Sequence, residues 1–296
     1  MEALRGTGVA LITPFREDGG VDVKALIDIV SFCKQGGIDY LVALGTTAES
    51  VTLSKTEKQL VLDTIVSAND GVLPLVVGIG GNHTTAVVQE LKTLDLSSFD
   101  AILSVSPYYN KPTQEGIYRH FEALAVASPK PIIMYNVPGR TGSNMLPSTT
   151  VRLAKDFDNI IGIKEACGDM VQIMEIIASK PQDFLLLSGD DLTALPTILA
   201  GGDGVISVLG QGIPTEFSTM VRLGLQGNVK EAYVYHYRLQ DGMQLIFEEG
   251  NPAGIKAIFE VLGLARASVR LPLVAASGAL KSKLTDFIAS MSKVTA

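Results

Sequence analysis

Short apolar runs alternate with amphipathic segments along the first three quarters of the chain. The apolar runs have the length and β-branched content of buried strands, and they span residues 8–12, 40–44, 75–79, 101–104, 131–135, 160–164, 184–188 and 204–208. Intervening segments carry apolar residues at spacings of three and four, as amphipathic helices do, for example at 23–35, 55–68, 114–127 and 192–200. Eight strand–helix units in succession predict an α/β protein built as a (β/α)8 TIM barrel. A doubly wound open sheet is the alternative.

The pattern changes after Gly227, where only helical periodicity continues. Amphipathic stretches at 229–247, 252–262 and 277–291 predict three further helices. No low-complexity linker separates the two parts of the chain. We therefore expect a barrel over 1–227 and a C-terminal helical region over 228–296 that packs against it.

Composition and charge narrow the class of protein. Of the 296 residues, 47% are hydrophobic and 19% charged, which suits a large core with strands buried on both faces. A net charge of -7 without a basic run argues against a nucleic-acid partner. No apolar run reaches the roughly 18 residues needed to span a membrane, and the start lacks the features of a secretory signal. We therefore expect a cytoplasmic protein without a membrane partner.

Signals for a metal or another cofactor are weak. The three histidines are scattered, and Cys33 and Cys167 form no Cys-x-x-Cys pair, so we expect reduced thiols and no cofactor. Asp190 and Asp191 would either bind a metal or cap the helix predicted at 192–200. Because this acidic pair follows the seventh strand, where barrel enzymes commonly bind phosphate, a phosphorylated substrate is disfavoured.

Lys164 is the most informative residue. It closes an apolar run in which an ordinary lysine would lose its hydration, whereas the other lysines mostly lie in polar stretches or beside loops. Burial lowers the pKa of a lysine, and a neutral amine can attack a carbonyl to form a Schiff base. Since side chains alternate across a strand, Gly162 and Lys164 would face the barrel interior while Ile161 and Ile163 face the helices. The alternative is a strand-end lysine that reaches water or pairs with a carboxylate.

Other polar groups follow the predicted strands, at the end where barrel enzymes carry their chemistry. Tyr135 ends the strand before Lys164 and could transfer protons, or could merely fill the core. Thr46 and Thr47 lie in a small-residue loop that could bind a carboxylate or cap a helix. Arg140, on a loop rich in Pro and Gly, could clamp a carboxylate or form a surface ion pair.

Together these segments resemble the dihydrodipicolinate synthase family of pyruvate-dependent, lysine Schiff-base aldolases. The matching segments are 45–50, 106–112, 135–142, 162–166, 188–191 and 204–208, and the resemblance covers essentially the whole chain. It implies a lyase that condenses pyruvate with L-aspartate 4-semialdehyde in the diaminopimelate route to lysine. It also implies a homotetramer, a dimer of dimers, because members of the family are commonly tetrameric.

The resemblance assigns the chemical steps to four residues. Lys164 would form the imine with pyruvate, and the resulting enamine would attack the aldehyde. Tyr135, Thr46 and Tyr109 would form a proton relay. In relatives, the tyrosine that matches Tyr109 reaches the site of a neighbouring subunit.

The resemblance also implies substrate contacts. Thr47, together with Thr46, would hold the pyruvate carboxylate, Arg140 would hold the second substrate, and the Ile206 carbonyl would face the site. One position departs from the family pattern, since Ala48 stands where glycine is usual. A methyl group is tolerated there only if the backbone φ is negative.

Two other functions fit part of this pattern. A sugar-acid aldolase, such as N-acetylneuraminate lyase or ketodeoxygluconate aldolase, would use the same lysine and tyrosine. Such relatives resemble each other in lacking an arginine at the place of Arg140. A catalytically silent barrel with a binding role would not need Lys164, Tyr135 and Thr46 together.

Some members of the family are inhibited by lysine. The positions matching the inhibitor pocket are Ser50, Lys55, Lys58, Asn82, Ala86 and Tyr108. Relatives that respond to lysine carry an acid at the place of Ala86 and commonly histidines at those of Lys55 and Lys58. Losing a carboxylate and gaining two cations both oppose an ammonium ligand, so we expect an enzyme insensitive to lysine.

Overall fold

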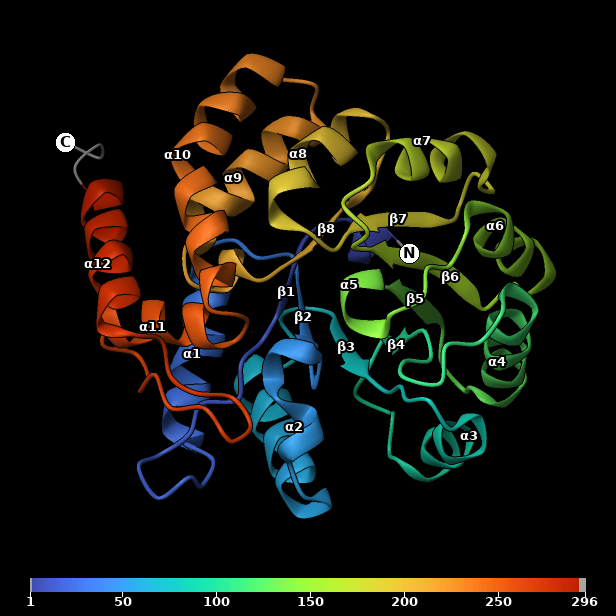
Figure 1. Cartoon of the computed structure of the whole chain (residues 1–296), viewed down its shortest axis with the longest axis horizontal. Coiled ribbons are helices and arrows are strands. Elements are labelled where there is room, and N and C mark those ends of the chain that lie inside the picture. Colours follow the sequence, from blue (N-terminus) through green and yellow to red (C-terminus); the bar gives the residue numbers. More distant parts are fainter. Residues whose placement is uncertain (1, 293–296) are drawn as a thin grey trace.

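The computed structural model describes residues 2–292. Within that range, eight parallel strands pair in sequence order and close into a barrel because β8 pairs with β1 (Figure 1). The strands are β1 (Gly6–Ala10), β2 (Tyr40–Ala43), β3 (Leu75–Gly78), β4 (Ala101–Val105), β5 (Ile132–Asn136), β6 (Ile160–Glu165), β7 (Leu185–Ser188) and β8 (Gly204–Ser207). The predicted (β/α)8 barrel is confirmed, and the open-sheet alternative is wrong.

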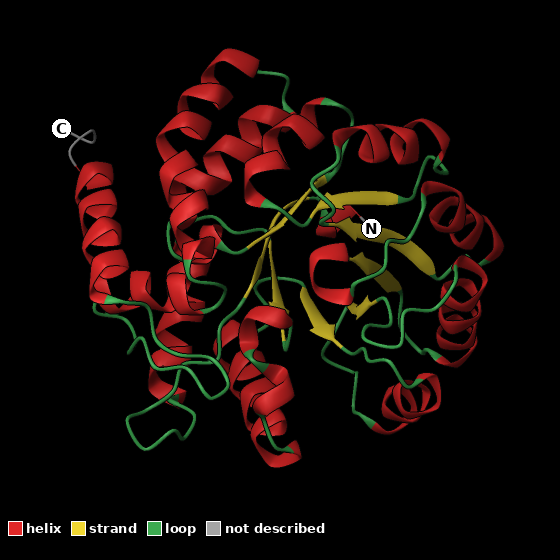
Figure 2. Cartoon of the chain, viewed as in Figure 1, coloured by secondary structure: helices red, strands yellow, loops and turns green. Residues whose placement is uncertain are grey.

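Helices surround the barrel between successive strands (Figure 2). They are α1 (Val23–Gln35), α2 (Lys55–Asn69), α3 (Thr84–Thr93), α4 (Gln114–Ala127), α6 (Pro147–Asp156), α7 (Met170–Ser179), α8 (Asp191–Leu199) and α9 (Pro214–Leu225), with the short α5 (Pro138–Thr141) after β5. Polar side chains fix several helix starts. Ser54 and Glu57 form a reciprocal capping box at α2, and Asp190 accepts a hydrogen bond from the Thr193 N–H at the start of α8. Asp190 is therefore a helix cap.

The barrel interior is filled by side chains, with a second apolar layer between strands and helices. Tyr40 is the largest buried side chain of the interior, and its hydroxyl donates to the Val205 carbonyl at 3.2 Å. A Cβ atom on Gly8 would lie 2.1 Å from the Tyr40 ring, so only glycine fits at that position. The barrel interior around Gly8 and Tyr40 is thus filled by side chains. A cavity can therefore form only nearer to the carboxyl ends of the strands.

One predicted orientation is wrong. Ile163 packs between strands and helices as expected, but Ile161 belongs to the interior layer. The β5–β6 register shifts between Ile132 and Ile133, which pair with Ile160 and Gly162. This bulge adds one residue to β6 and breaks the strict alternation on which the prediction rested.

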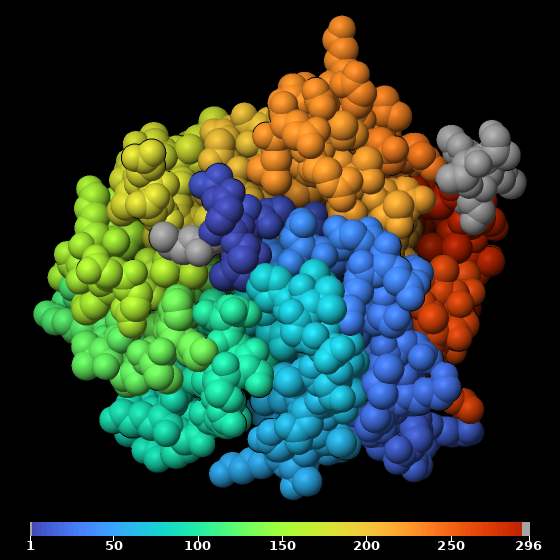
Figure 3. Space-filling view, turned by 180° about the vertical axis from the view of Figure 1, so that it is seen from behind, coloured from blue at the N-terminus to red at the C-terminus, as the bar shows by residue number. Residues whose placement is uncertain are grey.

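The N-terminal segment closes the other end of the barrel. The one-turn 3-10 helix Glu2–Leu4 precedes β1, and Leu4 packs into the interior layer. Seen from behind, this segment lies over the middle of the ring of strand–helix units (Figure 3). This segment thus covers the end of the barrel opposite the cavity, whose lining residues lie mostly at the carboxyl ends of the strands and in the loops after them.

Three helices follow the barrel: α10 (Val229–Glu248), α11 (Ala253–Val261) and α12 (Gly278–Ser292). They stand to one side of the barrel in Figure 1, where α10 packs against α8 and α9, and α12 packs against α10 and α11. Each predicted C-terminal helix is found, with its ends shifted by no more than one residue. No helix within residues 2–292 is long and apolar enough to cross a membrane.

Candidate active site

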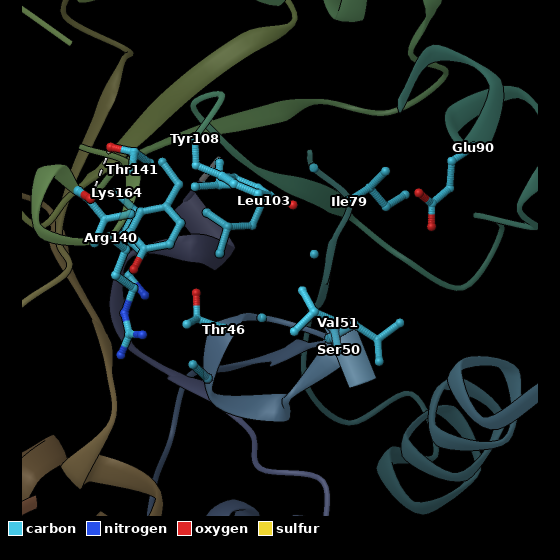
Figure 4. Close-up of a pocket in the computed structure, with 18 of the residues that line it drawn as sticks. Thr46, Ser50, Val51, Ile79, Glu90, Leu103, Tyr108, Arg140, Thr141 and Lys164 are labelled. Atoms are coloured by element: carbon cyan, nitrogen blue, oxygen red, sulfur yellow. Dashed lines mark hydrogen bonds between the residues drawn. The ribbon is translucent and has the colours of Figure 1, made fainter. Parts of the chain in front are cut away.

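A cavity of about 330 Å³ opens at the carboxyl ends of the strands. Its wall contains four of the predicted site residues: Lys164, Tyr135, Thr46 and Arg140. In Figure 4 Arg140, Thr141 and Lys164 gather at one end, Thr46 points in from the β2 loop, and Ile79 and Glu90 stand at the other end. This volume is at the small end of the range for small-molecule sites, so the cavity suits small substrates.

Lys164 lies at the end of β6 with its side chain 4% exposed. A Cβ on Gly189 would lie 3.1 Å from the Lys164 Cγ and Cε atoms, so the side chain runs along the bare backbone of this glycine into the cavity. Burial lowers the pKa of Lys164 to about 8, with the Asp191 carboxylate opposing this shift and the Arg140 charge adding to it. The lysine is therefore a poised amine within a cavity, and the alternative of a solvated strand-end lysine is wrong.

Tyr135 pairs with Lys164 across β5 and β6. The Lys164 Nζ lies 4.5 Å from the centre of the Tyr135 ring, over its face. Burial raises the pKa of the Tyr135 phenol, while the Arg140 charge and the Thr46 hydroxyl act in the opposite direction. The phenol is thus held in its protonated form next to the amine, ready to donate a proton.

The loop after β2 forms a one-turn 3-10 helix, Thr46–Ala48, beside Lys164. Thr46 lines the cavity, whereas Thr47 is buried behind it and its Oγ1 accepts a hydrogen bond from the Asn251 Nδ2 at 3.0 Å. Ala48 has no positive φ, so its methyl group is accommodated and the glycine usual in relatives is not required. The left-handed residues of this loop are Leu44 and Glu49, on either side of the turn.

Arg140 lies on α5, at the rim of the cavity. Its Nη2 donates to the Asn251 carbonyl at 3.5 Å, and no carboxylate among residues 2–292 forms an ion pair with it. The alternative of a surface ion pair is therefore not supported. A guanidinium without an anionic partner at the mouth of a cavity can bind a carboxylate from a ligand.

Besides Thr47, two more predicted residues do not line the cavity of this chain. Tyr109 is 88% exposed, with φ of 70°, on the loop after β4. Ile206 is fully buried on β8, in the interior layer, and lies outside the cavity wall. Tyr108 lines the cavity instead, and Asn82 holds its carbonyl through a hydrogen bond of 3.1 Å.

Several residues at the site were missed from the sequence. Asn251 joins the Thr46–Ala48 turn to Arg140, but a lone asparagine before a proline carries no signal of its role. Glu90 lines the outer part of the cavity with Ser50 and Lys58. Lys256 is fully buried on α11, and it carries the same signal that marks Lys164, a lysine within an apolar run.

The remaining polar candidates are structural. Asp191 is buried and accepts hydrogen bonds from the Val208 and Leu209 N–H groups at 3.2 and 2.8 Å. Burial raises its pKa to about 6, because the charged form loses hydration. No group of three or more His, Cys, Asp or Glu residues within 2–292 is arranged to hold a metal ion.

Comparisons with known proteins agree with this geometry. Residues 3–291 match the model of the dihydrodipicolinate synthetase family. The chain is 63% identical to 4-hydroxy-tetrahydrodipicolinate synthase of Flavobacterium psychrophilum over 293 residues, which cover 99% of this chain and 100% of the relative.

Solved structures lead to the same family. Dihydrodipicolinate synthase from Thermotoga maritima superposes with a TM-score of 0.95 at 36% identity, covering 97% of this chain and 98% of the other. Dihydrodipicolinate synthase from Cyanidioschyzon merolae with lysine bound superposes with a TM-score of 0.94 at 35% identity, and the match covers 98% of this chain and 99% of the other.

Proposed function

Because the chain belongs to the dihydrodipicolinate synthetase family, we propose that it is a Schiff-base-forming lyase that makes 4-hydroxy-tetrahydrodipicolinate. Its substrates are pyruvate and L-aspartate 4-semialdehyde, in the diaminopimelate route to lysine. The observation that carries this assignment is Lys164, a buried amine with a pKa of about 8 in a cavity it shares with Tyr135, Thr46 and Arg140.

The first step is imine formation. The neutral Lys164 Nζ attacks the keto carbon of pyruvate, and the carbinolamine loses its oxygen as water when a proton is supplied. Tyr135 is placed to supply that proton. With a pKa of about 8, about half of Lys164 is neutral at pH 8, against roughly 0.3% for a lysine with the ordinary pKa.

The second step forms the carbon–carbon bond. The imine loses a proton from the pyruvate methyl group, and the resulting enamine attacks the aldehyde carbon, whose oxygen takes up a proton to become the hydroxyl of the product. The amine of the semialdehyde then attacks the imine carbon and displaces Lys164, which closes the ring. One water is released overall, and protons pass through a relay of Tyr135, Thr46 and Tyr109.

The two substrate carboxylates are held by different groups of the cavity. Thr46 and Thr47 hold the pyruvate carboxylate, Arg140 holds the carboxylate of the semialdehyde, and the Ile206 carbonyl faces the substrates. Support comes from the position of Thr46 and Arg140 in the cavity wall and from the absence of an ion partner for Arg140 within residues 2–292.

The exposed Tyr109 needs a second subunit to act in the relay. We assign it to the site of a neighbouring chain in a cytoplasmic homotetramer, a dimer of dimers, which agrees with its 88% exposure. Light scattering measures the mass of the assembly. We also assign the reacting groups to the barrel, 1–227, and a supporting role to the C-terminal region, 228–296, whose last four residues lie outside the described part.

A coupled assay with pyruvate and L-aspartate 4-semialdehyde tests the function. Turnover should require both substrates, and N-acetylneuraminate and ketodeoxygluconate should not be cleaved. Cleavage of either sugar acid in place of the condensation would establish the sugar-acid aldolase alternative, which the family relatives do not favour. Binding of pyruvate without turnover of any of these compounds would instead indicate a silent barrel.

A further inference from the structure

A second buried lysine lies outside the cavity. Lys256, on α11, is 0% exposed, and its Nζ donates to the Glu49 Oε1 at 2.5 Å and to the Ser268 carbonyl at 2.8 Å. The ammonium also lies 4.0 Å from the centre of the Phe15 ring. A buried ion pair often stabilises a fold no better than apolar side chains of the same volume, so stability alone is a weak reason for this arrangement.

Glu49, the partner of Lys256, comes directly after the Thr46–Ala48 turn. Its φ of 53° is left-handed, a conformation that costs a residue with a Cβ roughly 1 to 2 kcal/mol and needs support from its surroundings. That support acts on both carboxylate oxygens, since Oε1 accepts from Lys256 and Oε2 accepts from the Arg270 N–H at 2.8 Å. The side chain therefore fixes the backbone that ends the turn.

Arg270 holds the other end of the same loop. Its guanidinium pairs with Glu57 on α2, donates to the Thr52 carbonyl at 2.8 Å and stacks 4.4 Å from the centre of the Phe15 ring. Between Glu49 and Glu57, the chain contributes Ser50 to the cavity wall. Lys256 and Arg270, both from the C-terminal region, thus bind Glu49 and Glu57. These two acidic residues lie on either side, in the sequence, of the segment that contributes Ser50 to the cavity wall.

We infer that Lys256 is a positioning residue for the Thr46–Ala48 turn and thereby for the carboxylate of pyruvate. This inference rests on the proposed function, which gives the turn its ligand. Lys256 acts through Glu49 and makes no contact with the cavity. Lys164 sits on β6, a separate element, so loss of Lys256 should displace the carboxylate contacts and leave the nucleophile in place.

The variant Lys256→Met nearly keeps the volume of the side chain, which is one heavy atom shorter, but leaves Glu49 with the Arg270 N–H as its remaining partner. It should raise the KM for pyruvate about tenfold or more, because small displacements of positioning groups have large effects on binding. The KM for the semialdehyde and the borohydride labelling at saturating pyruvate should stay within about twofold of those of the unchanged protein.

Lys281→Met is the matched control. Lys281 on α12 pairs with Glu260 on α11, also at 2.5 Å, but at a partly exposed site one helical turn beyond Lys256. This variant should change neither KM. The double variant Lys256→Met with Glu49→Gln removes the uncompensated buried charge and should move the KM for pyruvate back toward the original value.

A KM for pyruvate within twofold of the original in Lys256→Met, with only a lower melting temperature, would overturn the inference and leave Lys256 a structural role. If Lys256→Met does not fold, the double variant Lys256→Met with Glu49→Leu removes the pair and leaves no buried charge. It also removes both hydrogen bonds to the Glu49 carboxylate, so the KM for pyruvate should rise, and an unchanged KM for pyruvate there would overturn the inference equally. Failure of the proposed function is distinguishable, because the unchanged protein would then show no turnover of pyruvate with the semialdehyde in the coupled assay.

Discussion

Lys164 Nζ lies 4.5 Å from the centre of the Tyr135 ring, and the two residues pair directly at the carboxyl ends of β6 and β5. The amine rests on the face of the ring, so the phenol hydroxyl is free to meet a substrate oxygen bonded to the carbon under attack. Burial lowers the pKa of the amine and raises that of the phenol. Above about pH 8 the amine is therefore mostly neutral while the phenol, its proton donor, stays protonated.

The pKa of Lys164 sets the pH dependence of imine formation. A lowered pKa enlarges the neutral fraction at every pH below the ordinary lysine value, so kcat/KM for pyruvate should rise with pH and level off above about 8. Asp191→Asn removes the charge that opposes this shift and should move the midpoint to lower pH. A rate that keeps rising to about pH 10 would contradict the assignment.

The Tyr135 hydroxyl can be removed without disturbing the ring that packs beneath Lys164. Tyr135→Phe should lower kcat by about 10²- to 10⁴-fold, the usual contribution of a positioned proton donor. The label trapped from pyruvate should still appear on Lys164, only more slowly. An unchanged kcat would show that the hydroxyl only fills space.

Arg140 should matter for the second substrate and not for the first. Arg140→Ala removes a charge-assisted contact of roughly 1.5 to 3 kcal/mol, equivalent to about tenfold to two-hundredfold in kcat/KM for the semialdehyde. Arg140→Lys restores the charge without the planar fork and should recover only part of the loss. Unaltered kinetics with the semialdehyde would instead favour the sugar-acid alternative, which N-acetylneuraminate tests.

Lysine should not inhibit the enzyme at submillimolar concentration. Ala86 offers no carboxylate, Lys58 adds a cation to the cavity wall, and Lys55 is exposed. Glu90, one helical turn beyond Ala86 on α3, places a carboxylate in the cavity wall that was not predicted from the sequence. A lysine titration measures the balance: half-inhibition below 1 mM would contradict the prediction, and its loss in Glu90→Gln would assign the binding to that carboxylate.

The fold was predictable because barrel strands are short, apolar and separated by amphipathic helices. The errors have local causes. The first strand was placed at 8–12, but β1 covers Gly6–Ala10, since Leu11 and Ile12 are buried without belonging to the strand. Ile161 was misplaced because a bulge leaves no mark in apolar spacing.

Residues of the candidate site were predictable where a charged side chain stands in a stretch of sequence that otherwise carries little charge. Lys164 is a cation at the end of an apolar strand, and Arg140 is a cation in a Pro- and Gly-containing stretch with no Asp or Glu within ten residues of it in the sequence. Asn251 and Glu90 reach the site through the folding of distant segments, so no local pattern identifies them. Lys256 shows the limit of this criterion, because it is also a lysine within an apolar run but is buried away from the cavity.

The role of Lys164 as the nucleophile can be tested directly by trapping the imine. Incubation with pyruvate and borohydride, followed by proteolysis and mass spectrometry, should add one reduced pyruvyl group to the peptide that carries Lys164. Lys164→Arg should take up no label, because a guanidinium stays protonated at any working pH. A label on another lysine, or none on the unchanged protein, would contradict the account.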